Sequence, residues 1–409
     1  MAAKPHLFRQ REQHDHSPVT YIELFFDLVF VFAITQLSHR LLTHLSVHGA
    51  LETFILFLAV WWVWIFTSWV TNWLDPERGN VRLMLIMMMI GGLVLSSALP
   101  DAFGHSGWLF AIAYLTMQIG RTLHMIWASH GFHKARQQNF MRIGFWFLLS
   151  APFWLSGAAV SPDHRLWLWA LALGIEYAGP FQMFATPILG RSSTADWDIS
   201  GGHMAERCAL FIIIALGEGV LVTGASFADL DHNAVTWIAF ITSFIGSAAM
   251  WWIYFDIGAK RASDMISNAD NAGVIARNAY TYLHMPIVAG IILSAVGVQN
   301  VMKQPFGLAN VGFILTTIIG PALFLIGNQM FKWATAAVKY PPLSHFIGQL
   351  LLVSVGITGW YLGWQPLTFS LSATLSLLAT AVWERLSLRG GWQRWAPWLG
   401  SVFGWLRRN

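Results

Sequence analysis

Seven ionisable residues within long apolar segments of this chain stand out, because a charge there is costly and therefore informative. An ionisable side chain at the middle of a bilayer costs about 2.5–3.5 kcal/mol by insertion scales, and such residues usually face the interior of a helix bundle. We therefore treat the seven as candidates for binding a ligand or lining an ion pathway. They are Glu23, Asp27, Arg121, His124, Glu176, Glu218 and His284.

Two of the seven, Asp27 and Arg121, are predicted to form an ion pair. Glu23 and Asp27 are four residues apart and share one helix face. Another segment carries a polar face formed by Tyr114, Gln118, Arg121 and His124. At 1.5 Å per residue, Asp27 lies roughly 9 Å from one end of its segment and Arg121 roughly 10 Å from the corresponding end of its own. Such a pair could act as a gate, as a counter-ion for a substrate, or as a static contact that fixes helix packing.

Three others, Glu176, Glu218 and His284, are predicted to lie near the middle of the membrane. Each is roughly 16–20 Å from the same edge by the same count. Prolines follow Glu176 and His284, and glycines flank Glu218, so the backbone nearby can release polar groups to a ligand. A set of two glutamates and one histidine suits proton relay. The alternative is that each side chain is a hydrogen-bonded strut between helices.

Four more charged residues are predicted to be structural. Asp75, Glu77 and Arg78 follow an apolar segment where Pro76 ends the helix, and Asp256 ends another. Local charge pairing in a turn accounts for them. The chain also contains a single cysteine, which excludes an intrachain disulfide and a cysteine-based metal cluster. We find no nucleotide-binding loop, hydrolase elbow or zinc-protease motif, so we expect no catalytic residue, metal or cofactor, and enzyme activity stays open.

Composition sets the class of protein that carries these charges. The 409 residues are 56% apolar and only 11% charged, with a formal net charge of +4 and a mean hydropathy of +0.54. Soluble proteins average about 25% charged residues. The composition excludes a soluble enzyme, a disordered chain and a nucleic-acid-binding protein. We expect an all-α polytopic membrane protein, with the lipid bilayer as its first partner.

The apolar pattern predicts twelve membrane-spanning helices. They cover residues 21–43, 52–74, 82–100, 107–128, 140–160, 165–186, 204–226, 235–256, 275–297, 310–331, 345–363 and 367–386. Of the Lys and Arg residues, twenty fall on the side of the two tails, three fall on the other side, and Arg121 lies within a span. Basic loops stay in the cytoplasm, so both termini are predicted to be cytoplasmic. The tails are residues 1–20 and the basic, Trp-rich residues 387–409, which we expect to lie on anionic lipid.

The two halves of the chain resemble each other. GGLVLSSAL at residues 91–99 parallels AGIILSAVG at 289–297, and Glu176 parallels Glu384. We therefore predict two six-helix repeats, residues 21–186 and 204–386, joined by residues 187–203. Because six spans is an even number, the repeats would be parallel. The repeat positions of Asp27, Arg121 and Glu218 hold uncharged residues.

Four motifs resemble those of the bacterial low temperature requirement A family. They are ELFFDLVFVFA (residues 23–33), TNWLDPERGNVR (71–82), ERCALFIIIALGEG (206–219) and WWIYFD (251–256). The resemblance implies a multi-pass protein of the bacterial inner membrane that is linked to growth in the cold, and it supplies no reaction. FFDLVFVFAITQL (25–37) is also similar to the FSDG-containing helix of a lysosomal and bacterial potassium-channel family.

These patterns favour a secondary transporter of a small solute, which protons could drive through Glu218, Glu176 and His284. One alternative is a cation or proton channel lined by the first and seventh spans. Another is an intramembrane lipid-handling protein or enzyme. The expected partners are lipid, a small solute or ion and, in addition, a second copy of the chain as a homodimer.

Overall fold

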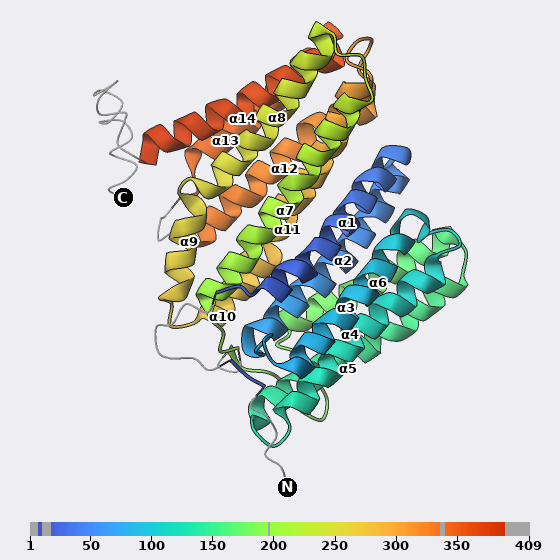
Figure 1. Ribbon diagram of the computed structural model, residues 1–409, viewed down its shortest axis with the longest axis vertical. Helices are drawn as coiled ribbons and strands as arrows, with labels where there is room; N and C mark the ends of the chain where they lie inside the picture. Colours follow the sequence, from blue (N-terminus) through green and yellow to red (C-terminus); the bar gives the residue numbers. More distant parts are fainter. Residues whose placement is uncertain (1–6, 10–17, 195–196, 336–339, 389–409) are drawn as a thin grey trace. The chain divides into compact units, whose positions relative to one another are not determined.

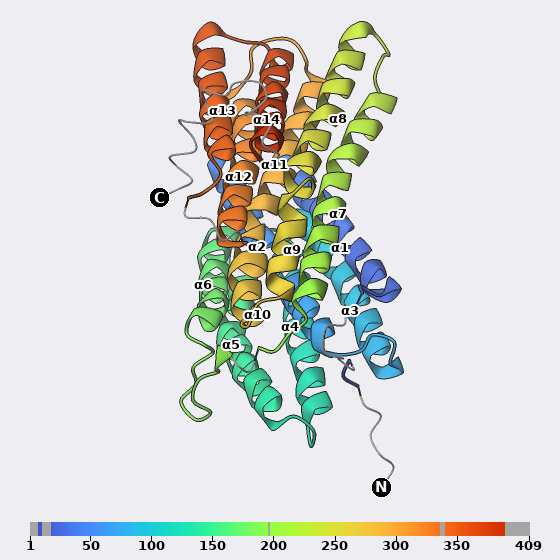
Figure 2. The same ribbon diagram turned by 90° about the vertical axis from the view of Figure 1, so that its left-hand side faces the viewer.

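The computed structural model describes residues 7–9, 18–194, 197–335 and 340–388. Within these ranges the chain is helical and contains no strand, and its isolated β-bridges join Phe8 to Leu74 and Thr186 to Gly190. The predicted C-terminal tail, residues 387–409, lies outside the described ranges except for its first two residues. Figures 1 and 2 show the course of the helices, which within each compact part of the chain run side by side.

The helices follow one another along the chain with short connections. Their bounds are α1 Tyr21–Thr43, α2 Val47–Trp73, α3 Gly79–Ala98, α4 Gly107–Ser129, α5 Lys134–Ala159, α6 Pro162–Phe181, α7 Gly201–Ala228, α8 Ala234–Phe255, α9 Gly258–Ser267, α10 Ala272–Ile275, α11 His284–Lys303, α12 Val311–Thr335, α13 Leu343–Leu362 and α14 Pro366–Leu388. A short 3₁₀ helix, Leu99–Asp101, follows α3. A π-helix, Ala276–Tyr282, precedes α11.

Each predicted span overlaps a helix of at least 20 residues, but the ninth differs from the expected regular helix. It consists of α10, the π-helix and α11, because the backbone widens to i→i+5 bonding for seven residues. Nine helical segments within the described ranges are long and apolar enough to cross a membrane. The segments that contain α4, α5 and α6 are not among them, since these helices carry more polar residues.

The chain forms two compact units. Unit 1 is Met1–Glu218 with Ser263–Met285, and unit 2 is Gly219–Ala262 with Pro286–Asn409. The chain passes from one unit to the other within α7, α9 and α11. The units therefore differ from the predicted repeats, because the first part of α7 belongs to unit 1.

In unit 1, α2 is the central helix. It packs against α1, α4 and α6, and every residue from Ala59 to Phe66 is buried. A helix that is apolar all round is expected at such a position. In its second half the polar side chains Thr67, Ser68, Thr71 and Asn72 are fully buried and so must find partners inside the protein.

In unit 2, α12 packs against α8, α13 and α14, and Figure 1 shows these helices together in one bundle. Glycines on α11 and α12 allow these two helices to approach closely. A Cβ added at Gly320 would lie 2.7 Å from the backbone nitrogen of Ser294, and one at Gly327 would lie 2.8 Å from that of Ile287. Close approach at small residues is how helices associate in membranes, where no hydrophobic force drives them together.

Candidate functional site

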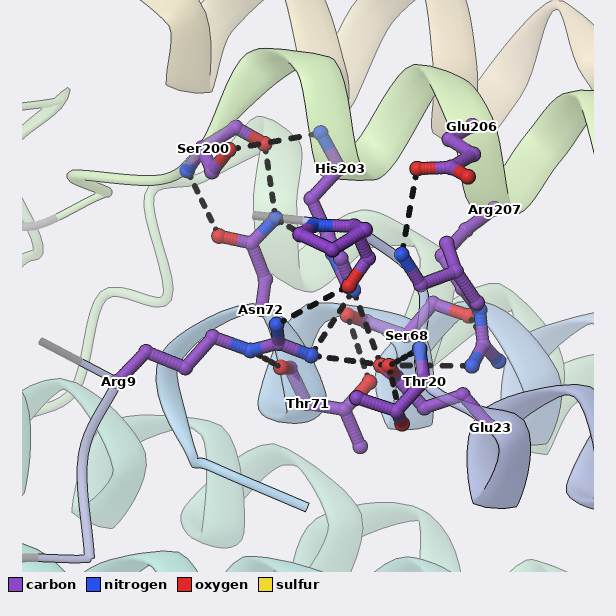
Figure 3. Close-up of polar contacts among 12 residues, drawn as sticks. Arg9, Thr20, Glu23, Ser68, Thr71, Asn72, Ser200, His203, Glu206 and Arg207 are labelled. Carbon is purple, nitrogen blue, oxygen red and sulfur yellow. Dashed lines mark hydrogen bonds and ion pairs between the residues drawn. The ribbon is translucent and has the colours of Figure 1, made fainter. Parts of the chain in front are cut away.

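Six polar side chains from α1, α2, α7 and the N-terminal segment meet in unit 1 (Figure 3). We call them the α1–α2–α7 network. They are Arg9, Glu23, Asn72, His203 and Arg207, which Figure 3 labels, and Asp27, which bonds to Arg207. The last five have 0% exposure, and the side chain of Arg9 is 9% exposed. Buried charges of both signs at one place are rare unless they are paired and hydrogen-bonded.

Glu23 sits at the centre of the network because of its place in α1. It is the third residue of the helix and reaches back to the first turn, where the backbone N–H and hydroxyl of Thr20 donate to Oε2 at 2.9 Å each. Arg9 also donates to Oε2 at 2.9 Å, and its Nε donates to the carbonyl of Thr71. A helix cap thus doubles as an acceptor that ties the N-terminal segment to α1 and α2.

His203 contacts three other members of the network. The backbone N–H of Ser200 donates to Oδ1 of Asn72 at 2.8 Å, and the amide nitrogen of Asn72 lies 3.2 Å from Nδ1 of His203. Nε2 of His203 lies 3.0 Å from Oε1 of Glu23 and 3.2 Å from Nη2 of Arg9. The imidazole ring thus links α2, α1 and the N-terminal segment.

Asp27 pairs with Arg207, and the predicted pair with Arg121 is wrong. Oδ1 of Asp27 lies 2.7 Å from Nη2 of Arg207 and accepts from the indole of Trp64 at 2.8 Å. Arg207 also lies 3.5 Å from Oε1 of Glu23 and donates to Ser68. The prediction compared only the depths of Asp27 and Arg121 along their helices. The helix that faces Asp27 is α7 and not α4.

Hydrogen-bonding capacity remains unused in this network. Among the described residues, Oδ2 of Asp27 and both Nε and Nη1 of Arg207 have no hydrogen-bond partner, although all three atoms are buried. An unsatisfied buried polar atom costs about 1–3 kcal/mol. Such a cost inside an otherwise well-bonded cluster favours a group that changes partners over a purely structural one.

A second polar group in unit 1 links Arg121 to Glu176 through intervening side chains. Arg121 donates to the amide oxygen of Gln118, the amide nitrogen of Gln118 donates to the hydroxyl of Tyr114 at 3.0 Å, and Tyr114 donates to Glu176. Arg121 also donates to Thr67 on α2 at 3.1 Å. The face of α4 that was predicted to be polar therefore carries a continuous chain of hydrogen bonds.

Glu176 accepts further hydrogen bonds in addition to the one from Tyr114. Ser150 and the indole of Trp154, both on α5, donate to Oε1 at 2.6 Å and 2.9 Å. Three donors from two neighbouring helices surround this carboxylate. This arrangement is what an interhelical strut requires.

The remaining candidates contact different elements. Glu218 accepts from the hydroxyl of Thr35 on α1 at 2.5 Å. His284 bonds through Nδ1 to the carbonyl of Ala279 at 3.0 Å, and His124 packs its ring on Trp127. Glu176, Glu218 and His284 thus share a predicted depth but bond to separate groups.

The charges at the helix ends pair locally. Arg78 lies 3.2 Å from Asp75 and Arg82 lies 2.7 Å from Glu77, and all four side chains are at least partly exposed. Asp256 forms the C-terminal cap of α8. Exposed pairs of this kind contribute about 0–1 kcal/mol each.

Arg9, Asn72, His203 and Arg207 were not among the predicted site residues. Arg207 lies in the motif at residues 206–219. Because it is near the end of a span, it was counted only among the basic residues that set the orientation of the chain. His203 precedes the predicted span. The available signal was the spacing of four between His203 and Arg207, which places both on one face of α7.

Comparison with known proteins extends over nearly the whole chain. Residues 18–383 match the family model described as bacterial low temperature requirement A protein. The chain is also 40% identical over 384 residues to the uncharacterized protein RA0937 of Rhizobium meliloti (strain 1021), covering 93% of this chain and 92% of that protein. No solved structure matches.

Proposed function

The chain belongs to the bacterial low temperature requirement A family, and we propose that it is a secondary transporter of a small solute. In this proposal the α1–α2–α7 network is the cytoplasmic gate. The apolar helices make it an integral membrane protein, and the bacterial family supports a place in the cytoplasmic membrane. The observation that carries the proposal is the network itself, with two carboxylates and two guanidinium groups, of which Asp27 and Arg207 are fully buried but incompletely bonded among the described residues.

Energetics favour a gate over a strut at this position. Removing paired charges from water often costs as much as the pairing returns, so an apolar contact would hold three helices together at least as well. A gate formed by charged groups that exchange partners can open and close with little net change in free energy. Both features are expected where a protein alternates between two states.

The division into two units supports the same proposal. The boundaries fall inside helices, between Glu218 and Gly219 in α7 and between Met285 and Pro286 in α11. Glycine and proline are residues at which helices bend. Alternating access needs two bodies that move about a few flexible points, and these positions suit that role.

The finer architecture belongs to the proposal as well. It has twelve spans in two parallel six-helix repeats, with α4, α5 and α6 among the spans and both termini in the cytoplasm. The distribution of Lys and Arg supports the orientation. Helix packing supports the repeat. In the first half, α4 and α6 each contact both α2 and α5, and in the second half α12 and α14 each contact both α8 and α13.

Proton coupling would use Glu218. The residue is only 2% exposed, and within the described part of the chain one neutral hydroxyl, that of Thr35, donates to its carboxylate. Three donors hold the carboxylate of Glu176, so a change in its protonation would disturb more hydrogen bonds. We therefore assign proton exchange to Glu218 and a structural role to Glu176.

Accessibility of a buried cysteine tests the gate. Thr71 is fully buried beside the network, and its hydroxyl bonds only to its own helix. In a Cys208→Ala background, we expect Thr71→Cys to react slowly with a membrane-impermeant thiosulfonate in everted vesicles. Adding Arg207→Met should speed the reaction at least ~10-fold, because losing about 1.4 kcal/mol of closed-state preference changes the open population tenfold.

The control for this experiment is Lys332→Met in unit 2, which removes a buried cation of similar exposure. It should leave the labelling rate of Thr71→Cys unchanged. Equal acceleration by both substitutions would mean general loosening and would contradict the gate. Fast labelling of the unsubstituted network from both membrane faces would indicate a channel instead.

Proton movement tests the coupling. In proteoliposomes that contain a pH dye, a panel of single amino acids, monocarboxylates and sugars should include a solute that drives proton uptake. Glu218→Gln should abolish that uptake, and Glu206→Gln on the same helix should preserve it. Equal uptake in both variants, or none with any solute, would contradict proton coupling.

A further inference from the structure

A cavity of about 50 Å³ lies in unit 1 between α2, α5, α6 and the π-helix. Seven aromatic rings line it, among them Trp69, Trp73, Phe140 and Trp197. Its lining contains no carboxylate, and Arg277 of the π-helix is the one charged residue among the described residues that line it. None of these residues belongs to the α1–α2–α7 network.

Two polar side chains in the wall keep free donors. Asn139 accepts from the hydroxyl of Ser192 through Oδ1 at 2.6 Å, and its amide nitrogen donates to no described residue although the side chain is 1% exposed. Arg277 uses Nη1 for the carbonyl of Pro180 at 3.3 Å, and its Nη2 likewise has no acceptor within the described ranges. The side chain of Asn139 is buried and that of Arg277 is half-buried, so both donors remain available to a ligand in the cavity.

The backbone of the cavity wall is also specialised. The indole of Trp69 donates to the hydroxyl of Thr281, inside the π-helix, at 3.0 Å. Phe184 of the lining and its chain neighbour Met183 have φ of 46° and 54°, the left-handed region that side chains other than glycine avoid. π-Helices and strained residues both concentrate at ligand sites.

We infer that this cavity binds the carboxylate end of an aliphatic monoacid. The single positive charge and the free amide donors select an anion, and a guanidinium binds a carboxylate with two parallel hydrogen bonds. The aromatic walls accommodate hydrocarbon next to it. Arg277 already lies 5.2 Å from the ring centre of Trp197, so the rings do not form a cage for a second cation.

The size of the cavity limits the ligand. A water molecule needs roughly 10–15 Å³ of such space, so the cavity takes about four waters, or a carboxylate with two or three carbons. A short acid would fit entirely, and a fatty acid would extend its chain beyond the cavity. Binding at this site does not depend on the transport proposal, because it is measured at equilibrium and without a gradient.

Titration calorimetry on the full chain in detergent tests this inference, with propionate as the short probe, decanoate as the long probe and propionamide as a neutral control of equal shape. We expect propionate to bind and propionamide to bind at least ~10-fold more weakly, since a hydrogen bond to a charged group is that strong. Tighter binding of decanoate would identify a membrane fatty acid as the source, and equal binding would identify a free short acid.

Variants make the test independent of folding. Asn139→Asp keeps the shape and the acceptor for Ser192 but opposes the anion, and Arg277→Gln removes the cation. Each should weaken propionate binding at least ~10-fold, whereas Arg82→Gln, an exposed arginine paired with Glu77, should not. The inference is overturned if propionamide binds as well as propionate, if wild type binds neither, or if all three variants bind alike.

Discussion

Lys332 in unit 2 and Arg207 in unit 1 are both buried cations that pair with a carboxylate, yet they differ in how fully they are bonded. The ammonium of Lys332 has three protons, and it reaches Oε1 and Oε2 of Glu384 at 2.7 Å and 2.8 Å and the carbonyl of Ile253 at 2.6 Å. Arg207 has five protons and, among the described residues, donates hydrogen bonds to Asp27 and Ser68 alone, with Glu23 at 3.5 Å from its Nη1.

The difference separates a structural contact from a candidate for movement. A saturated ion pair can only lose hydrogen bonds when it rearranges, so it holds α12 and α14 in one arrangement. An unsaturated pair can gain hydrogen bonds in another arrangement or with water. Such a pair therefore stabilises the arrangement in which it is observed less strongly. Three substitutions, ordered by expected effect, would break or sharpen this comparison.

Loss of the saturated cation should have the largest effect on stability. Lys332→Met should lower the free energy of unfolding by about 3–5 kcal/mol, because it leaves Glu384 buried and unpaired. Thermal unfolding in detergent measures the loss, and Lys303→Met, at an exposed lysine, is the matched control. Adding Glu384→Gln should restore much of the stability. If the double variant is no more stable than Lys332→Met, the pair is not the source of the effect.

The unsaturated cation should matter less. Arg207→Met should cost about 1–3 kcal/mol, since Asp27 keeps Trp64 and Glu23 keeps Arg9 and Thr20 as donors. A double-mutant cycle with Asp27→Asn should give a coupling of about 0.5–3 kcal/mol.

The same cycle with Arg121 in place of Arg207 distinguishes the observed pair from the one expected from depth alone. Arg121 donates to Val63, Thr67 and Gln118, so its substitution should add to Asp27→Asn within ~0.5 kcal/mol. Strong coupling between Asp27 and Arg121 together with none between Asp27 and Arg207 would reverse the assignment.

Loss of a neutral hydrogen-bond donor should have the smallest effect on the free energy of unfolding. Thr35→Val removes the hydroxyl that bonds to Glu218 and should cost about 1 kcal/mol, the usual net value of a single hydrogen bond. Thr43→Val on the same helix is the control, because its exposed hydroxyl bonds only to backbone of its own turn and to His44. A loss at Thr35 as large as that at Lys332 would contradict the ranking of charged above neutral contacts.

The sequence predicted the positions of the helices well because each long apolar run has few ways to satisfy its backbone in lipid. It also predicted the polar face of α4, since Tyr114, Gln118 and Arg121 follow helical spacing and all three are buried in one chain of hydrogen bonds. The sequence did not predict the π-helix, because residues 276–282 have no pattern that separates i→i+5 bonding from i→i+4 bonding.

Partners were predicted less well than positions. Depth in the membrane follows from counting residues, but it does not say which neighbouring helix faces a side chain. Asp27 was therefore given Arg121, at a similar depth, and not Arg207, one turn into a helix that is distant in sequence. Glu176, Glu218 and His284 share a depth for the same reason and still bond to different elements.

The π-helix also bears on how relatives of this chain can be aligned. A seven-residue π-helix has the geometry of an α-helix that has received one extra residue. Deleting one residue from 276–282 would restore α-helical bonding and rotate everything that follows by about 100°, the turn of one residue in a helix of 3.6 residues per turn. His284 and the face of α11 that carries Gly290 would then point elsewhere. A family member with a one-residue gap here would keep the same helices but a different packing surface on α11.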